Sequence, residues 1–126
     1  MKLGEHFDER EFGVNLPDQV KQNYHLLCKL ILDKLRNQFG VVQITSGYRR
    51  PKKNEMVGGV TTSQHLLGEA VDFYCPHAPD GMGPVYFFII NDLHWLGEVF
   101  LYRRKGHIHL GLPRFNIKVD QAILDE

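Results

Sequence analysis

The sequence has few cysteines, no net charge and no long hydrophobic run, and each shortage argues against a class of protein. Its 126 residues include two cysteines, Cys28 and Cys75, in no Cys-x-x-Cys arrangement, so cysteine-based zinc or redox chemistry has no support. Fifteen basic and fifteen acidic residues cancel, which argues against a nucleic-acid partner. The longest apolar run, VYFFII at 85–90, is far too short to cross a bilayer, so we expect no membrane partner.

The first residues also lack the continuous apolar stretch of a secretory signal. Met1 is followed by the charged segment KLGEHFDEREF, so we expect a protein that is cytoplasmic as synthesised. The length suits a single domain over residues 1–126, and we expect a monomer. Cys28 falls within an apolar helical pattern and Cys75 ends an apolar strand pattern, which favours buried free thiols over a disulfide.

Hydrophobic periodicity predicts both helix and strand. Residues 16–40 place apolar side chains, Leu30 among them, at helical spacing between Pro17 and Gly40, which predicts one long amphipathic helix. The β-branched run at 41–45 and the segment 69–75 predict strands. Residues 83–93 predict a short buried helix, with a strand as the alternative. Residues 46–67 are rich in glycine and polar side chains and predict a long loop, a type of segment that often carries function.

The last third of the chain predicts a hairpin. Residues 98–104 and 107–112 both alternate between apolar and polar side chains, with Lys105 and Gly106 as the turn. The resulting fold class is α+β, a small and mainly antiparallel sheet packed against one long helix. The tail at 113–126 contains the alternating run FNIKV and either adds an edge strand or covers the core.

Histidine is abundant, with seven in the chain, and it is the commonest metal ligand in proteins. A zinc site used for hydrolysis has three ligands drawn from His, Asp, Glu or Cys, with an open position for water. His65 and Asp72 follow the long loop, and His107 and His109 share one face of the second hairpin strand. The alternative is a pair of half-buried strand histidines that bond to backbone carbonyls.

The segment SGYRRPKKNEMVGGVTTSQHLLGEAVDF at 46–73 closely resembles a family of zinc peptidases. The family is typified by D-alanyl-D-alanine carboxypeptidases, D-Ala-D-Ala dipeptidases and phage L-alanyl-D-glutamate endopeptidases, and the Hedgehog signalling domain shares its fold and metal site. The shared elements are Ser-Gly-Tyr-Arg, an Asn, a Gly-Gly pair and Ser-x-His-x-x-Gly-x-Ala-x-Asp, followed later by His-x-His. In this chain they are Ser46, Gly47, Tyr48, Arg49, Asn54, Gly58, Gly59, Ser63, His65, Gly68, Ala70, Asp72, His107 and His109. With the opening EHFDEREF, the resemblance covers roughly residues 5–112.

This resemblance implies a Hedgehog/DD-peptidase-like fold and a Zn²⁺ ion held by His65, Asp72 and His109. It also implies that Arg49 faces the carboxylate of the peptide or the developing oxyanion, as a catalytic and substrate-binding group. Ser63 would either bind the substrate or orient the loop. The implied substrate is a stem peptide of bacterial peptidoglycan or a D-Ala-containing dipeptide, cleaved by metal-assisted hydrolysis without a covalent intermediate.

The general base is the open question. Relatives carry an acid three residues before, six residues before or two residues after the last zinc histidine, where this chain has Gly106, Arg103 and Gly111. His107 is the remaining candidate, because it would lie beside the zinc water and could move its proton. Its other role would be to support the metal site. Glu98 is a second candidate if the strand register carries it into the cleft; otherwise it is exposed or paired with a basic neighbour.

These patterns lead to three candidate functions. The first is a D-Ala-D-Ala carboxypeptidase-like zinc metallopeptidase of the cell wall, such as an endolysin that reaches the wall by a separate route. The second is a zinc-binding module that keeps the fold, binds peptides or cell wall and has lost activity, which the empty acid positions favour. The third is a metal-free structural protein of a virion or cell surface, and an absence of zinc in the purified protein would favour it.

Overall fold

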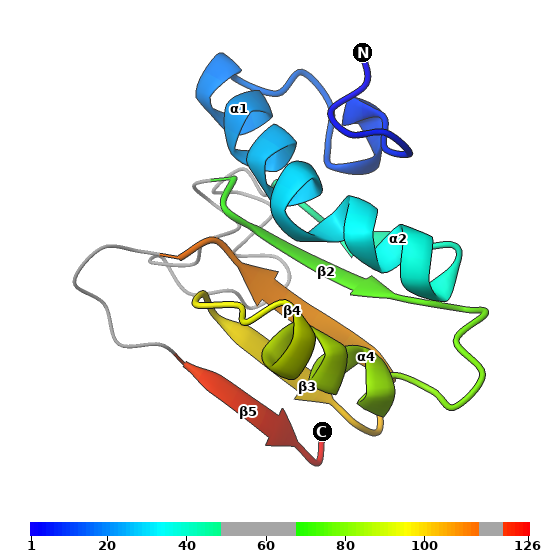
Figure 1. Ribbon diagram of the computed structural model, residues 1–126. Coiled ribbons are helices and arrows are strands. Elements are labelled where there is room, and N and C mark those ends of the chain that lie inside the picture. The colour runs from blue at the N-terminus through cyan, green and yellow to red at the C-terminus, as the bar shows by residue number, and fades with distance from the viewer. Residues whose placement is uncertain (49–67, 114–119) are drawn as a thin grey trace.

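The protein was analysed as a computed structural model that describes residues 1–48, 68–113 and 120–126. The described strands form one five-stranded sheet in the order β1-β2-β4-β3-β5. The helices lie on one face of this sheet (Figure 1). The fold is therefore α+β, as predicted. The strands are β1 (Gln43–Ser46), β2 (Ala70–Tyr74), β3 (Val99–Tyr102), β4 (His107–Gly111) and β5 (Gln121–Leu124).

The sheet is mixed rather than wholly antiparallel. β2 pairs antiparallel with both β1 and β4, and β3 and β4 form the predicted antiparallel hairpin. β5 pairs with β3 in the parallel direction and forms an edge of the sheet. The tail thus adds an edge strand, but the strand is QAIL at 121–124. The alternating run FNIKV at 115–119 lies outside the described residues.

The prediction of one long helix is wrong in detail. The helical segment divides into α1 (Asp18–Leu27), a π-helical turn η2 (Cys28–Leu32) and α2 (Asp33–Phe39), and it stops at Gly40, where φ is +81°. A π-helical turn adds a residue to the repeat and so shifts which side chains face the core. Leu30, one of the apolar residues at helical spacing, is 40% exposed, whereas Cys28 and Leu32 are fully buried.

The segment predicted as a short helix at 83–93 is helical over residues 83–92, and the alternative strand is wrong. α4 (Gly83–Phe87) continues into a second π-helical turn, η3 (Phe88–Asp92). Among the described residues, no helix has both the length and the hydropathy that a membrane span requires. The predicted state of the cysteines is confirmed, because Cys28 and Cys75 are both buried free thiols.

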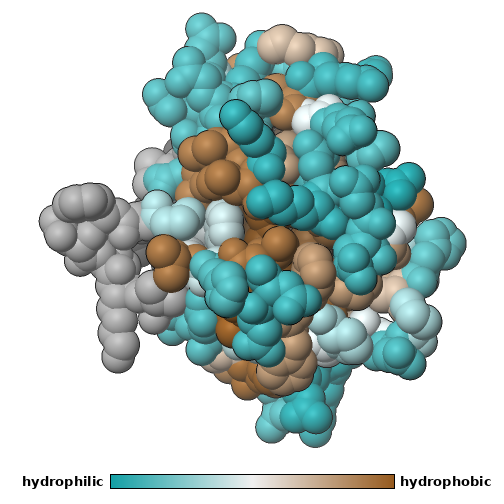
Figure 2. All heavy atoms as spheres, in the orientation of Figure 1, coloured by the Kyte–Doolittle hydropathy of each residue, from teal (hydrophilic) through white to brown (hydrophobic). Residues whose placement is uncertain are grey.

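The hydrophobic core lies between the helices and one face of the sheet. The core side chains of β2 and β4 are Val71, Phe73, Ile108 and Leu110, all of them fully buried. Side chains alternate along a strand, so the residues between them project from the opposite face. Figure 2 shows the helix side of the molecule, where hydrophobic residues reach the surface between larger hydrophilic areas.

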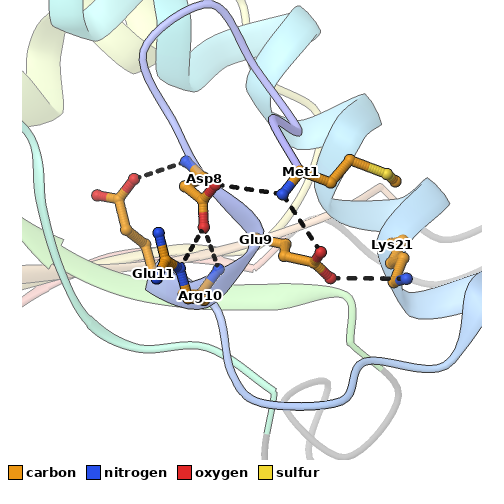
Figure 3. A network of polar contacts seen from close by, with 6 residues as sticks. All are labelled: Met1, Asp8, Glu9, Arg10, Glu11 and Lys21. Carbon is orange, nitrogen blue, oxygen red and sulfur yellow. Dashed lines mark hydrogen bonds and ion pairs between the residues drawn. The ribbon is translucent and has the colours of Figure 1, made fainter.

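The first eleven residues are held by a network of polar contacts near the start of α1 (Figure 3). Asp8 caps the short 3₁₀ helix η1 (Glu9–Glu11), and Glu11 accepts a hydrogen bond from the Asp8 backbone at 2.8 Å in return. Glu9 forms ion pairs with the N-terminal amine of Met1 at 3.4 Å and with Lys21 of α1 at 3.6 Å. These contacts attach the N-terminal segment to the helix layer.

Phe12, which directly follows this segment, links α1 to the strands that carry the site. The ring of Phe12 stacks on that of Tyr24 with centroids 4.5 Å apart, and the Tyr24 hydroxyl donates to the backbone oxygen of Ala70 at the start of β2, at 2.9 Å. The backbone N–H of Tyr48 donates to the oxygen of Phe12 at 2.8 Å. At Gly47 the Phe12 backbone comes so close that a Cβ would collide with it. The chain therefore leaves β1 in a fixed direction.

Candidate metal centre

Two of the three predicted metal ligands meet across neighbouring strands. Asp72 of β2 is the direct register partner of His109 on β4. The side chains touch, with His109 Nδ1 2.9 Å from Asp72 Oδ1, and His109 and Asp72 are only 13% and 16% exposed respectively. The third predicted ligand, His65, lies outside the described residues, as do Arg49 and Ser63.

A β-bulge in β1 sets which of its residues lies opposite Asp72. Ile44 of β1 pairs with Phe73, but the next register pair is Ser46 with Asp72, so Thr45 is an extra residue. Bulges of this kind bend a strand and change the direction of the chain beyond it. The Thr45 hydroxyl stabilises the bulge by donating to the backbone oxygen of Asp72 at 3.1 Å. Ser46, which begins the Ser-Gly-Tyr-Arg segment, thereby lies opposite the predicted aspartate ligand.

Glu98 approaches the other ring nitrogen of His109. The distance from His109 Nε2 to Glu98 Oε1 is 2.6 Å, and Glu98 is 32% exposed. The ring of Phe100 stacks on the imidazole at a centroid distance of 5.7 Å. The strand register therefore brings Glu98 into the site, which is the condition for Glu98 to be a candidate general base. Glu98 also contacts a basic group there, and that group is His109. Both nitrogens of this ring face a carboxylate.

This arrangement strongly favours a positive charge at His109. Burial by itself would lower the pKa of His109, but hydrogen bonds to Asp72 and Glu98, and the charges of both, outweigh it and raise the pKa to about 9. The same carboxylate–imidazole pair offers oxygen and nitrogen donors of the kind that zinc binds. Asp72 and His109 therefore fit a divalent cation, which would take the place of the Nδ1 proton.

The described residues do not complete a metal site on their own. Within residues 1–48, 68–113 and 120–126, no group of three His, Cys, Asp or Glu side chains could hold a metal ion. Glu98 does not serve as the third ligand beside Asp72, because it lies at the opposite nitrogen of the same ring. A third ligand must come from another segment, and His65 remains the predicted one.

His107 shares the sheet face of His109, as predicted from the His-x-His spacing. Its ring packs against that of Tyr102 at a centroid distance of 4.8 Å. Burial lowers the pKa of His107; the charge of Asp72 opposes this, and the charges of Lys105 and His109 add to it. His107 is consequently neutral near pH 7 and can accept a proton. Its catalytic role stays a prediction.

The hairpin register differs from the one that the predicted turn implies. A two-residue turn at Lys105 and Gly106 would pair Tyr102 with His109. The turn instead spans Arg103–Gly106, so Tyr102 pairs with His107 and Phe100 pairs with His109. Sequence reasoning missed the contacts of both aromatic rings with the histidines. The alternation of the first hairpin strand already placed these rings on the same face as the histidines. Which ring lies opposite which histidine depends on the length of the turn.

One comparison with known proteins identifies a family. The family model described as Peptidase M15 matches residues 7–111 of the chain, which include β1 to β4 and both halves of the candidate metal centre. No curated protein matches the chain. The match leaves out β5 and the rest of the tail, in agreement with the extent of the resemblance in the sequence.

Proposed function

The chain belongs to the peptidase M15 family, and we propose that it is a zinc-dependent peptidase acting on D-amino-acid-containing peptides of bacterial peptidoglycan. The observation that carries the proposal is the contact of Asp72 with His109 across β2 and β4. Peptidases of this family are zinc-dependent, and the resemblance in the sequence implies that these two residues are zinc ligands. The finer proposal is a carboxypeptidase-like cleavage of the stem peptide near its D-alanine end.

In this proposal Asp72 and His109 hold the zinc ion together with His65. When bound, zinc supplies Lewis acidity at the scissile carbonyl and favours deprotonation of the attacking water. Arg49 would bind the carboxylate of the peptide or the developing oxyanion, because a guanidinium is a fixed cation with several donors. Ser63 would bind the substrate or orient the loop.

His107 is the general base that we propose. It lies two residues from His109 on the same sheet face, and its lowered pKa keeps it neutral near pH 7, as a proton acceptor must be. The packing of its ring against Tyr102 fixes where the imidazole lies. Replacement by alanine should therefore abolish hydrolysis while the zinc content stays unchanged.

The proposal is tested by digesting purified disaccharide-pentapeptides and following their masses. Protein loaded with one equivalent of zinc should shorten the peptide stem, and the same sample treated with a chelator should not. Restoring zinc to the chelated sample should restore cleavage. If zinc-loaded protein leaves pentapeptides, cross-linked dimers and D-Ala-D-Ala unchanged over long incubations, the proposed hydrolysis is wrong.

A second function is favoured by one specific observation. The three positions where relatives carry an acid hold Gly106 in the hairpin turn, Arg103 in an ion pair with Asp125 at 3.6 Å, and Gly111 at the end of β4. A zinc-binding module that binds peptides without cleaving them would likewise need no acidic side chain at these three positions. Such a module would bind zinc and muropeptides, and the masses of those muropeptides would not change.

A further inference from the structure

We infer that Glu98 is the positioning residue of the metal centre, fixing the imidazole of His109 so that Nδ1 points at the ion. The inference rests on the proposed function, since it concerns the same site. Glu98 belongs to none of the motif elements that carry the family resemblance. Its role is assigned by its contact with His109.

The contact is directed at the nitrogen that faces away from Asp72. Glu98 Oε1 lies 2.6 Å from Nε2, while Asp72 Oδ1 lies 2.9 Å from Nδ1. A distance of 2.6 Å is at the short end even for a charge-assisted hydrogen bond. An imidazole held at both nitrogens and covered by the Phe100 ring has little freedom to rotate about its side-chain bonds.

The chemistry of imidazole turns this contact into a preference for one tautomer. A neutral imidazole carries one N–H and one lone pair. If Glu98 accepts the N–H at Nε2, the lone pair stays on Nδ1, which is the nitrogen that faces Asp72. Carboxylates that hold the non-ligating nitrogen of a metal-bound histidine in this way both orient the ring and raise its basicity.

The same geometry argues against the other role considered for Glu98. A general base must reach the water that attacks the substrate, beside the ion. Glu98 is separated from the Asp72 side by the imidazole itself, and its contacting oxygen is engaged by Nε2. His107, by contrast, lies on the same strand face as His109 and is two residues from it along β4. Positioning therefore fits Glu98 better than proton transfer does.

The backbone around Glu98 is built to hold its carboxylate in place. The Gly111 N–H donates to the backbone oxygen of Glu98 at 2.8 Å, which extends the β3–β4 ladder by one residue. At Gly97, the Gly111 oxygen lies so close that a Cβ would collide with it. Trp95 Nε1 donates to the same oxygen at 3.1 Å, and Gln121 of β5 donates to the Trp95 oxygen at 2.8 Å. The backbone that carries Glu98 is thus tied to both neighbours of β3, which are β4 and β5.

The experiment measures zinc affinity by competition with a chromophoric chelator, without substrate, for wild type, Glu98→Ala and Glu98→Gln. Glu98→Ala should bind zinc about 10- to 100-fold more weakly, the usual loss when such a partner is removed. Glu98→Gln should recover most of the affinity, because its amide oxygen can still accept the Nε2 proton. Long-range ¹H–¹⁵N spectra of zinc-loaded wild type should show His109 protonated at Nε2 and bound through Nδ1.

Asp120→Ala is the matched control, because Asp120 is an exposed acid beside β3 whose backbone oxygen, not its side chain, bonds Val99. It removes the same charge and should leave zinc affinity unchanged. The inference is overturned if Glu98→Ala binds zinc as wild type does, if Asp120→Ala loses as much, or if glutamine restores nothing. It is also overturned if Glu98→Ala binds zinc normally but cannot hydrolyse peptide, which would make Glu98 a base.

The two levels of proposal remain separable in this experiment. A wild-type protein that binds zinc but cleaves no peptide contradicts the proposed activity, while the affinities of the variants still test Glu98. A wild-type protein that binds no zinc contradicts both. Melting curves of the metal-free variants show whether each one folds. If Glu98→Ala does not fold, the zinc affinity of Glu98→Gln still tests the inference.

Discussion

Replacing Gly97 by alanine should destabilise the protein at the base of the metal centre. A Cβ at this position would collide with the backbone oxygen of Gly111 and would lie 2.8 Å from Trp95 Nε1 and 2.9 Å from the backbone nitrogen of Pro113. Two of these three obstacles are backbone atoms, which cannot move aside as the end of a flexible side chain can. The end of β4 or the segment before β3 must therefore shift.

The expected cost lies near the top of the range for adding one methyl group to a packed interior, about 3 kcal/mol. In a domain of this size that loss lowers the melting temperature by roughly 10 °C. Trp95 is the only tryptophan in the chain, so its fluorescence reports unfolding from the site of the change. Urea unfolding of metal-free wild type and Gly97→Ala, followed by this signal, gives the difference directly.

Gly83→Ala is the control for this experiment. Gly83 starts α4 and a Cβ there meets nothing within 4 Å, so the same change of residue should alter stability by less than about 1 kcal/mol. The reasoning is refuted if Gly97→Ala is as stable as wild type, or if both glycine variants lose the same amount. Either result would mean that the contact between the Gly97 segment and β4 does not hold the chain in place.

Three further results are expected. Tyr24→Phe should lose about 1 kcal/mol in urea unfolding, because it removes the buried hydroxyl that donates to the Ala70 oxygen; an unchanged midpoint would contradict that contribution. In metal-free protein the raised pKa of His109 should stabilise the fold by up to ~3 kcal/mol. This contribution to the free energy of unfolding is fully present below about pH 6.5 and is lost as the pH rises through about 9. A free energy of unfolding that stays constant over this window would contradict the contact with two carboxylates. Burial raises the pKa of the Cys75 thiol to about 11 and raises that of Cys28 as well, so a thiol reagent at pH 8 should label both only as fast as the protein unfolds, and rapid labelling of native protein would contradict the burial.

Much of the sheet could be predicted because its signals are local. The alternation of residues 98–104 and 107–112 indicated a hairpin and put His107 and His109 on one face, as the structure has them. The pairing of Asp72 with His109 joins strands 37 positions apart, and in the sequence only the family motif suggested it. Periodicity gives the face of a strand but not its neighbour.

The differences from prediction have identifiable causes. A 3.6-residue period assumes a regular helix, so it could not anticipate the π-helical turn at Cys28–Leu32 or the exposure of Leu30. The parallel pairing of β5 with β3 leaves no mark in the alternation of the strand itself, because alternation gives neither the neighbour of a strand nor its direction. Glu98 bonds His109 because the turn is two residues longer than expected, which slides β3 along β4.

The most direct test of the account is the zinc stoichiometry of wild type and Asp72→Asn, measured on protein dialysed against micromolar zinc without chelator. We expect one zinc per wild-type chain and a loss of most of that zinc in the variant, because the amide keeps the size of the side chain but removes the charged donor beside His109. A wild-type chain that binds no zinc, or a variant that binds it equally well, would contradict a metal centre at Asp72 and His109.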